Sequence, residues 1–232
     1  MAGRILWVAG AYLAGTLPSA LLVARLRWNR GGRSLVAEVR REVGELDPHV
    51  LMARHLGPRW SAAAAALDVG KGIAFMFCAR ELGHLPPGWL AACGVAVVVG
   101  HAFPFYAARM AGRGLAAAAG VYLVLLPWEM VAAGAMILIG LAARNSGIAT
   151  TIGMASVPAV AAWQGQPAAY VAMSAVIFVL ILARRLEGVG AVIRSGVSPA
   201  RAIVARCLLD ATAAPGGGTI AGHGGSAPPS TS

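Results

Sequence analysis

Long apolar runs, separated by short segments that carry arginines, constrain this chain more than any other feature. Of its 232 residues, 58% are hydrophobic and only 12% are charged, whereas a soluble domain carries about 25% charged residues. A membrane-spanning helix needs about 20 apolar residues, with a lower limit near 17. The sequence therefore predicts an all-α, polytopic membrane protein. The apolar runs cover Ile5–Val23, Ala62–Ala79, Trp89–Tyr106, Leu115–Leu126, Met130–Ala143, Ile148–Trp163 and Ala168–Ala183.

The fourth and fifth runs are short and could instead form one long helix. Such a helix would place Glu129 near the middle of the membrane, where an unpaired charge is costly. It would also put Arg144 and the arginine-rich tail outside, against the tendency of basic loops to stay in the cytoplasm. We therefore expect about seven transmembrane helices, with the N-terminus outside and the C-terminus cytoplasmic. The outer side then receives only Arg4 and Arg80 of the basic residues.

The formal net charge of +10 does not indicate a nucleic-acid partner, because the basic residues lie between apolar runs and not along one polar face. Cys78, Cys93 and Cys207 have neither a disulfide framework nor a zinc spacing, and the chain contains no P-loop or dinucleotide-binding fingerprint. We expect no metal and no cofactor. The run Ile5–Ala14 could be the core of a signal peptide, but in a chain of further spans it is more simply the first helix.

Residues 1–210 are predicted to form one integral membrane domain. Its one sizeable cytoplasmic loop, Arg25–Trp60, interleaves arginines with glutamates and is expected to be partly helical at the membrane interface. From Ala211 onward the sequence is rich in alanine, glycine, proline, serine and threonine, without lysine, arginine or acidic residues. Residues 211–232 are therefore predicted to form a disordered, low-complexity tail.

The first candidate functional segment is Gly15-Thr16-Leu17-Pro18-Ser19-Ala20, in the inner half of the first run. Glycine and proline loosen the helical hydrogen-bond ladder, and at membrane depth every freed backbone group needs a partner. Freed amides or the hydroxyls could meet an anionic ligand here. The alternative is helix packing through small residues, with a mild kink at the proline.

The second segment, Asp68-Val69-Gly70-Lys71-Gly72, puts a carboxylate and an ammonium three residues apart in the second run. Both lie on one helix face, so they can neutralise each other. Ionisable residues inside a membrane mark candidate functional sites. The alternative is a structural ion pair that fixes this span against its neighbours.

The third segment joins a histidine, two arginines and several glycines at the cytoplasmic end of the third run. His101 precedes a proline break, Arg109 and Arg113 flank the following loop, and Gly112 and Gly114 allow close backbone approach. A helix N-terminus preceded by glycines and arginines favours anion binding. A lone histidine is more often structural and juxtamembrane arginines are more often topological anchors, but their combination favours a site.

Together these segments resemble the bacterial membrane glycerol-3-phosphate acyltransferases that take their acyl group from acyl phosphate, the PlsY family. The order, the spacing and the seven-span layout are similar over roughly residues 5–200. The family patterns GxxPxA, DxxKG, GHxFPxF, a GKGxAT-like turn and a PW pair resemble, in that order, Gly15–Ala20, Asp68–Gly72, Gly100–Phe105, Gly112–Ala117 and Pro127-Trp128.

The chain departs from this family in the first cytoplasmic loop, where members carry GSGNxGxxN. Arg41-Glu42-Val43-Gly44 aligns with the lead-in, but Glu45-Leu46-Asp47-Pro48-His49 follows. The exchange removes flexible glycines and introduces acidic residues where anionic substrates would bind. The lysine of the GKG turn is Arg113 here, which keeps the charge but changes its shape and hydrogen bonding.

The resemblance implies an enzyme of the cytoplasmic membrane that transfers an acyl group from acyl phosphate to glycerol 3-phosphate, giving lysophosphatidate for phospholipid synthesis. Its partners would be these two substrates and membrane lipids. The resemblance assigns catalysis to His101, as general base or orienting group, and to Ser19, which would line the site. It assigns phosphate binding to Arg41, Arg109, Gly112, Arg113 and Gly114, with Asp68 and Lys71 as structural or supporting residues.

The replaced glycine signature leaves a second hypothesis open, a homologue that has lost catalysis and acts as a membrane binding or scaffold protein. A small-solute transporter is a weaker alternative, because no inverted repeat or pair of broken helices is evident. The sequence indicates neither the oligomeric state nor the preferred acyl chain.

Overall fold

The computed structural model of the protein describes residues 1–28, 49, 52–53, 56–106, 112–142, 146–187, 189–194 and 196–207. Every regular element within these ranges is a helix, as the composition predicts. In chain order the helices are α1 (Ala2–Thr16), α2 (Ser19–Trp28), α5 (Pro58–Glu81), α6 (Pro87–Ala102), α7 (Leu115–Leu125), α8 (Pro127–Ala142), α9 (Ser146–Trp163), α10 (Ala168–Leu186), α11 (Val189–Arg194) and α12 (Pro199–Cys207).

Proline sets the start of many of these helices. Pro58, Pro87, Pro127 and Pro199 are the first residues of α5, α6, α8 and α12. Proline suits this position because its fixed φ matches the helix and its missing N–H would have had no intrahelical partner. The same property explains why α7 and α8 are separate, since the chain breaks at Leu126 (φ −139°, ψ 57°) directly before Pro127.

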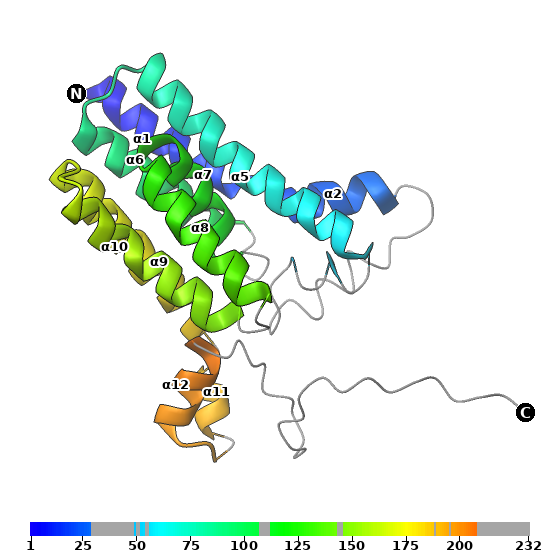
Figure 1. The fold of residues 1–232 in the computed structure, drawn as a ribbon. Coiled ribbons are helices and arrows are strands. Elements are labelled where there is room, and N and C mark those ends of the chain that lie inside the picture. Colours follow the sequence, from blue (N-terminus) through cyan, green and yellow to red (C-terminus); the bar gives the residue numbers. More distant parts are fainter. Residues whose placement is uncertain are drawn as a thin grey trace, which may run out of the picture.

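The helices α1 and α5 to α10 run side by side in one bundle, and α2 and the first turns of α5 extend beyond it (Figure 1). The helices α11 and α12 project from the end of the bundle where α10 finishes (Figure 1). The most extensive contacts join α1 to α6, α5 to α7 and α8 to α9. The pairs α1–α6 and α5–α7 join helices that are not consecutive, so the topology interleaves the first and middle parts of the chain, whereas α8 and α9 follow each other directly.

Small residues make the contact between α1 and α6 very close. A Cβ atom added to Gly15 would overlap the carbonyl of Val97, and one added to Gly100 would overlap the carbonyl of Tyr12. Close backbone approach through small residues is a common way of packing membrane helices, because lipid provides no hydrophobic force between them. This packing confirms one of the two interpretations of Gly15 and brings the C-terminal end of α6 against the Pro18 break.

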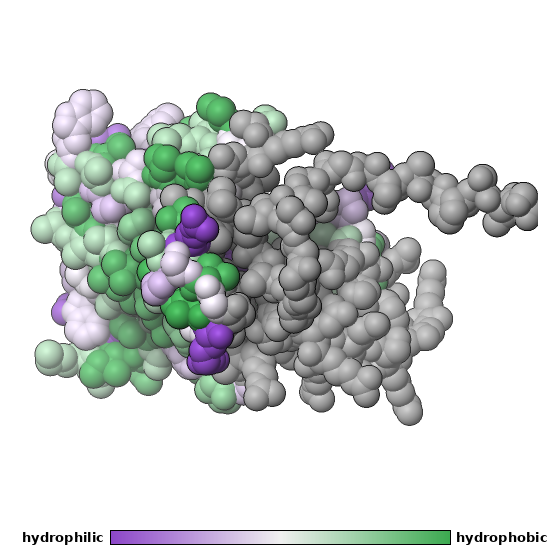
Figure 2. Space-filling model, turned by 90° about the horizontal axis from the view of Figure 1, so that it is seen from below, coloured by the Kyte–Doolittle hydropathy of each residue, from purple (hydrophilic) through white to green (hydrophobic). Residues whose placement is uncertain are grey.

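Large apolar side chains cover the outside of the bundle instead of being confined to its core. Seen from the end, apolar residues reach the rim of the molecule (Figure 2). A soluble monomer rarely exposes so large an apolar surface, whereas lipid accommodates it. Exposed examples are Leu6, Leu13, Phe77, Leu123, Trp128, Val131, Leu138, Ile139, Ile152, Trp163, Val176 and Val179.

The helices agree with the predicted apolar runs, except for a break within the first run and an earlier end of the third. By length and composition alone, α5 and α10 could each cross a membrane, and α1 with α2 could form one further span bent by 43°. The helices α6, α7, α8 and α9 are shorter apolar segments. The first run is therefore sharply broken where a mild kink was expected, and the third helix ends at Ala102, four residues before the predicted Tyr106.

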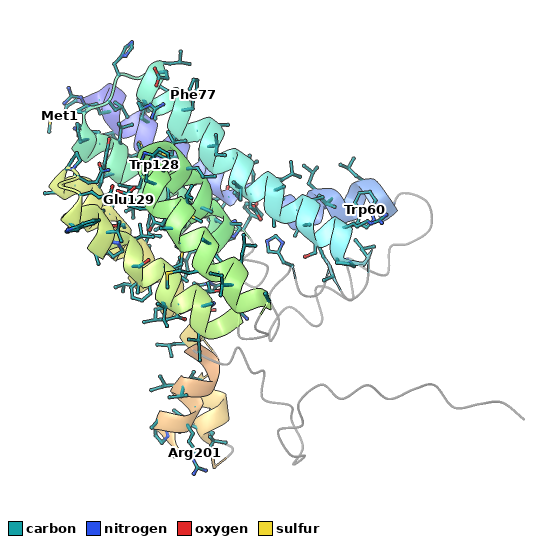
Figure 3. The ribbon with its side chains drawn as sticks, in the orientation of Figure 1. Met1, Trp60, Phe77, Trp128, Glu129 and Arg201 are labelled. Atoms are coloured by element: carbon teal, nitrogen blue, oxygen red, sulfur yellow. The ribbon has the colours of Figure 1, made fainter. Side chains whose placement is uncertain are left out.

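Glu129 lies in the first turn of α8 and is only 1% exposed. Its Oε1 atom accepts a hydrogen bond of 3.0 Å from Nε2 of Gln166, in the turn before α10. Glu129 therefore lies at the end of the bundle that also holds Met1, opposite the end that holds Trp60 and Arg201 (Figure 3). The break at Leu126 keeps this carboxylate away from the middle of a continuous helix.

Replacing Gly100 with valine should separate α1 from α6, because the added side chain meets the Tyr12 backbone. Overpacking of this kind costs about 1–3 kcal/mol, so the thermal midpoint in detergent should fall by roughly 5 °C. The matched control is Gly88→Ala on the same helix, where an added Cβ meets no atom within 4 Å. Equal midpoints for the two variants would contradict the close contact.

Candidate functional site

The site begins at the break between α1 and α2. Pro18 has no N–H to donate and ends the helical ladder of α1, so nearby carbonyl oxygens lose their helical partners. Tyr106, from the turn after α6, donates its hydroxyl to the carbonyl of Thr16. Tyr12 in turn donates to the carbonyl of Phe103 at 3.0 Å. These two phenols fasten the break to the end of α6.

Lys71 satisfies the other carbonyls of the break. Its Nζ atom donates to the carbonyl oxygens of Gly15 at 2.8 Å and Leu17 at 2.9 Å. The same atom lies 2.7 Å from Oδ1 of Asp68, one turn away on α5. An ammonium has three N–H groups, and besides these three oxygens the Nζ atom also has Nδ1 of His101 as a neighbour, at 3.0 Å. Lys71 is thus a bridge between α5 and the broken first span.

Asp68 is the centre of the polar cluster and is 2% exposed. Besides Lys71, its Oδ1 atom accepts a 2.7 Å hydrogen bond from the hydroxyl of Ser19, the first residue of α2. Nδ1 of His101 lies 3.3 Å from the same oxygen, and Nε2 of His49 lies 3.1 Å from Oδ2. A buried carboxylate needs paired charge and hydrogen bonds, and four elements of the chain supply them here.

The neighbours of His101 define the hydrogen bond that Nδ1 makes in each of its two neutral tautomers. Nδ1 lies 3.0 Å from Nζ of Lys71 as well as 3.3 Å from Asp68. In the tautomer with its proton on Nε2, Nδ1 accepts from the Lys71 ammonium, and in the tautomer with its proton on Nδ1, it donates to Asp68. In that tautomer Nε2 has a free lone pair and can accept a proton.

Gly112 lies against the Nε2 edge of this imidazole. A Cβ atom added to Gly112 would overlap Nε2 of His101, and its ring carbon Cε1 would be 2.9 Å away. Arg113 follows, half-buried, and Gly114 adopts a left-handed conformation (φ 89°) directly before α7. Only glycine takes this conformation without strain. The backbone between His101 and the N-terminus of α7 is therefore compact.

The C-terminal end of α10 borders the same side of the molecule. The guanidinium of Arg184 lies 5.2 Å from the ring centre of Phe103 and pairs with Glu187. Arg185 is buried, and its Nη1 atom donates to the carbonyl of Gly147 at 3.2 Å and to Oγ1 of Thr151 at 3.0 Å. Arg185 therefore fixes α10 to the start of α9.

The structure brings together most of the residues that the sequence singles out. Ser19, Asp68, Lys71 and His101 form one hydrogen-bonded cluster, and Gly112 touches His101. The sequence left two interpretations of the Asp68–Lys71 pair open, a functional site and a structural ion pair. In the structure the pair joins α5 to α1, and both of its side chains also contact His101. Arg41 and Arg109, together with the replaced loop residues 45–48 and the tail from 211, lie outside the described residues.

The sequence did not reveal His49 or the two tyrosines. The sequence analysis named His49 only as a member of the segment that replaces the glycine signature, and its spacing did not indicate a contact with Asp68. Tyr12 and Tyr106 lie in apolar runs, where a hydroxyl at membrane depth signals the need for an acceptor. That signal, next to a proline break, could have identified them as partners of the freed carbonyls.

The cluster can hold a proton acceptor next to a potential anion-binding backbone. The Asp68 carboxylate orients His101, the imidazole presents Nε2 towards Gly112, and the amides that begin α7 follow directly. Within the described residues, no group of three or more His, Cys, Asp and Glu side chains is arranged to hold a metal ion. The chemistry that these side chains offer is proton transfer beside bound negative charge.

Comparison with known proteins identifies the family of this chain. The family model described as glycerol-3-phosphate acyltransferase matches residues 5–195. A glycerol-3-phosphate acyltransferase of Geobacter sulfurreducens is 30% identical over 192 residues, which cover 82% of this chain and 93% of that protein. The protein of the same name from Laribacter hongkongensis is 31% identical, over 77% of this chain and 87% of its own length.

Solved structures are similar as well. The glycerol 3-phosphate form of PlsY, an integral membrane glycerol 3-phosphate acyltransferase, aligns with a TM-score of 0.69 and 25% identity over 83% of this chain and 93% of that one. Its lysophosphatidic acid form aligns with a TM-score of 0.67 at 22% identity and supports the fold. The bundle is thus that of an integral membrane protein of the acyltransferase class. More narrowly, the chain belongs to the glycerol-3-phosphate acyltransferase family.

Removing both charges of the Asp68–Lys71 pair should cost less stability than the two single removals added together. Lys71→Met leaves Asp68 buried without its cation, and breaking a buried ion pair costs about 3–5 kcal/mol. Thermal unfolding in detergent should therefore show that Lys71→Met with Asp68→Asn loses less stability than the sum of the single variants. Strictly additive losses would mean that the two charges do not depend on each other.

Proposed function

We propose that this protein transfers an acyl group from acyl phosphate to glycerol 3-phosphate and so produces lysophosphatidate for membrane phospholipid synthesis. The observation that carries the proposal is the position of His101, held by Asp68 on one side with its Nε2 edge against Gly112 on the other. Membership of the glycerol-3-phosphate acyltransferase family supports the choice of acceptor. The choice of donor comes from the resemblance of the sequence motifs to PlsY.

The reaction requires one bond to form and one to break. The hydroxyl oxygen of glycerol 3-phosphate attacks the acyl carbonyl carbon, an ester C–O bond forms, and the C–O bond to phosphate breaks. His101 takes the hydroxyl proton at Nε2 while Asp68 stabilises the imidazolium through Nδ1. Phosphate leaves as a stable anion, so positioning and charge neutralisation contribute much of the rate.

Both substrates carry phosphate, so the site needs more than one anion-binding group. Arg113 would hold a phosphate next to His101, and the amides at Gly112 and Gly114 would assist it. Arg41 and Arg109, outside the described residues, are proposed for the same role. Ser19 donates to Asp68, so its part in catalysis would be to hold the carboxylate and not to attack the substrate.

The bundle is proposed to cross the cytoplasmic membrane seven times. The bent pair of α1 and α2 would form the first span, and the six helices α5 to α10 would form the others. Six helices and the bent pair give an odd number of crossings, so the termini would lie on opposite sides. The basic residues at the end of the bundle that includes Arg113, Arg184 and Arg185 favour a cytoplasmic location for that end.

Activity should depend on His101 and on the charge at position 113. With purified protein, acyl phosphate and labelled glycerol 3-phosphate, His101→Ala should lower the rate of lysophosphatidate formation by roughly 10²- to 10⁴-fold, the contribution typical of a general base. Arg113→Ala should raise KM for glycerol 3-phosphate, and Arg113→Lys should restore most of the loss because it keeps the charge. Release of inorganic phosphate should match ester formation.

The control is His84→Asn, at an exposed turn position with φ 44°, where asparagine tolerates the left-handed conformation. This variant should keep wild-type kinetics. Purified wild-type protein that forms no lysophosphatidate from both substrates would contradict the proposed reaction. In that case, failure to rescue growth of a strain without its own acyltransferase would favour the binding or scaffold role suggested by the replaced glycine signature.

The proposed topology predicts which positions a membrane-impermeant thiol reagent can reach. In a variant without native cysteines, the substitutions Gly3→Cys and Gly88→Cys should be labelled in cells whose inner membrane is intact. Both positions are exposed and would face outside in the proposed topology. Cysteine at Ala200, exposed at the other end of the protein, should react only after the inner membrane is permeabilised. Labelling of all three positions in intact cells would contradict seven spans.

A further inference from the structure

His49 is a described residue of the first cytoplasmic loop, and two contacts fix it to α5. The hydroxyl of Ser61 donates to its backbone carbonyl at 2.8 Å. Its Nε2 atom lies 3.1 Å from Oδ2 of Asp68. Ser61 and Asp68 are seven residues apart and therefore lie two turns apart on one face of α5. Backbone and ring of His49 are thus both held by the same helix face.

A small apolar core joins α2, the loop and α5, and its residue on α5, Ala64, lies between Ser61 and Asp68 in the sequence. Val23 from α2, Met52 from the loop and Ala64 from α5 are buried together. Leu56 and Trp60 pack against them. Packing of this kind holds the loop residue Met52 against α5. His49 itself is held beside Asp68 by its contacts with Ser61 and Asp68.

The two oxygens of Asp68 have different partners. Oδ1 is shared by Ser19, Lys71 and His101. Within the described part of the chain, His49 is the one side chain in contact with Oδ2. A carboxylate held at only one oxygen can rotate about its last torsion, whereas contacts at both oxygens fix its plane. His49 consequently determines how Oδ1 is directed at Nδ1 of His101.

We propose that His49 is a positioning residue, which fixes the Asp68 carboxylate from the loop side and thereby holds His101 in its proton-accepting orientation. This role rests on the proposed function of His101. When Gly44 is aligned with the first glycine of the family pattern GSGNxG, His49 falls at its last glycine. A glycine there has no side chain to offer Asp68.

Kinetics should distinguish positioning from substrate binding. His49→Ala should lower kcat roughly tenfold, the loss expected when one hydrogen bond to a charged group is removed, with KM for glycerol 3-phosphate within about twofold of wild type. His49→Gln should restore most of kcat, since its amide N–H can also donate to Oδ2. In an Asp68→Asn background, His49→Ala should add little. His84→Asn serves as the control histidine at the other end of the protein.

A second readout needs no activity. The thermal midpoints in detergent of His49→Ala, Asp68→Asn and their combination should be clearly less than additive, because both variants break one contact. If wild-type protein makes no lysophosphatidate, the proposed function fails, and this comparison still tests the contact. The inference would be overturned by additive midpoints, by unchanged kcat in His49→Ala, by a rise in KM alone, or by no recovery in His49→Gln.

Discussion

The structure depends on the hydrogen bonds that one ammonium group, that of Lys71, donates to the carbonyl oxygens freed at the break in the first span. The break at Pro18 frees carbonyl oxygens at a depth where water is scarce, and each unsatisfied group there would cost several kcal/mol. Lys71 supplies donors to Gly15 and Leu17. A buried ammonium in turn requires an anion, and Asp68 provides it one turn away. The break, the lysine and the aspartate therefore form one unit, since Lys71 binds the freed carbonyls and Asp68 neutralises Lys71.

That unit also explains the position of His101, the proposed catalytic histidine. The close packing of Gly15 against α6 brings His101 to the break, and the carboxylate that neutralises Lys71 has lone pairs left to orient an imidazole. Structural and functional demands are thus met by the same side chains. Such economy is expected in a thin apolar bundle, where every additional buried charge is expensive. It also means that substitutions at Asp68 or Lys71 report on folding before they report on chemistry.

Much of this could be predicted from the sequence, because the membrane makes simple demands on a chain. Apolar length located the helices within a few residues, and the spacing of Asp68 and Lys71 predicted their pairing. The 43° bend between α1 and α2 was underestimated, since the sequence shows that Pro18 weakens a ladder but not which side chains will stabilise the opened form. The same holds for His49: its contact with Asp68 joins residues from a loop and a helix, and no periodicity relates the two.

The histidine and the loop that carries it suggest how this chain tolerates the loss of a glycine-rich signature. Glycines let a loop approach bound anions through its backbone, but they leave the loop without side-chain contacts that define its position. A histidine bound to Asp68 gives up some of that backbone freedom and gains a fixed link to the site. The link has a direct consequence for Asp68, whose second oxygen is then occupied by the protein and unavailable to bind a substrate hydroxyl. Under the proposed function, substrate recognition would accordingly be concentrated on the other side of His101, at Gly112 and Arg113, where the guanidinium and the backbone amides would take the place of the glycine-rich cradle.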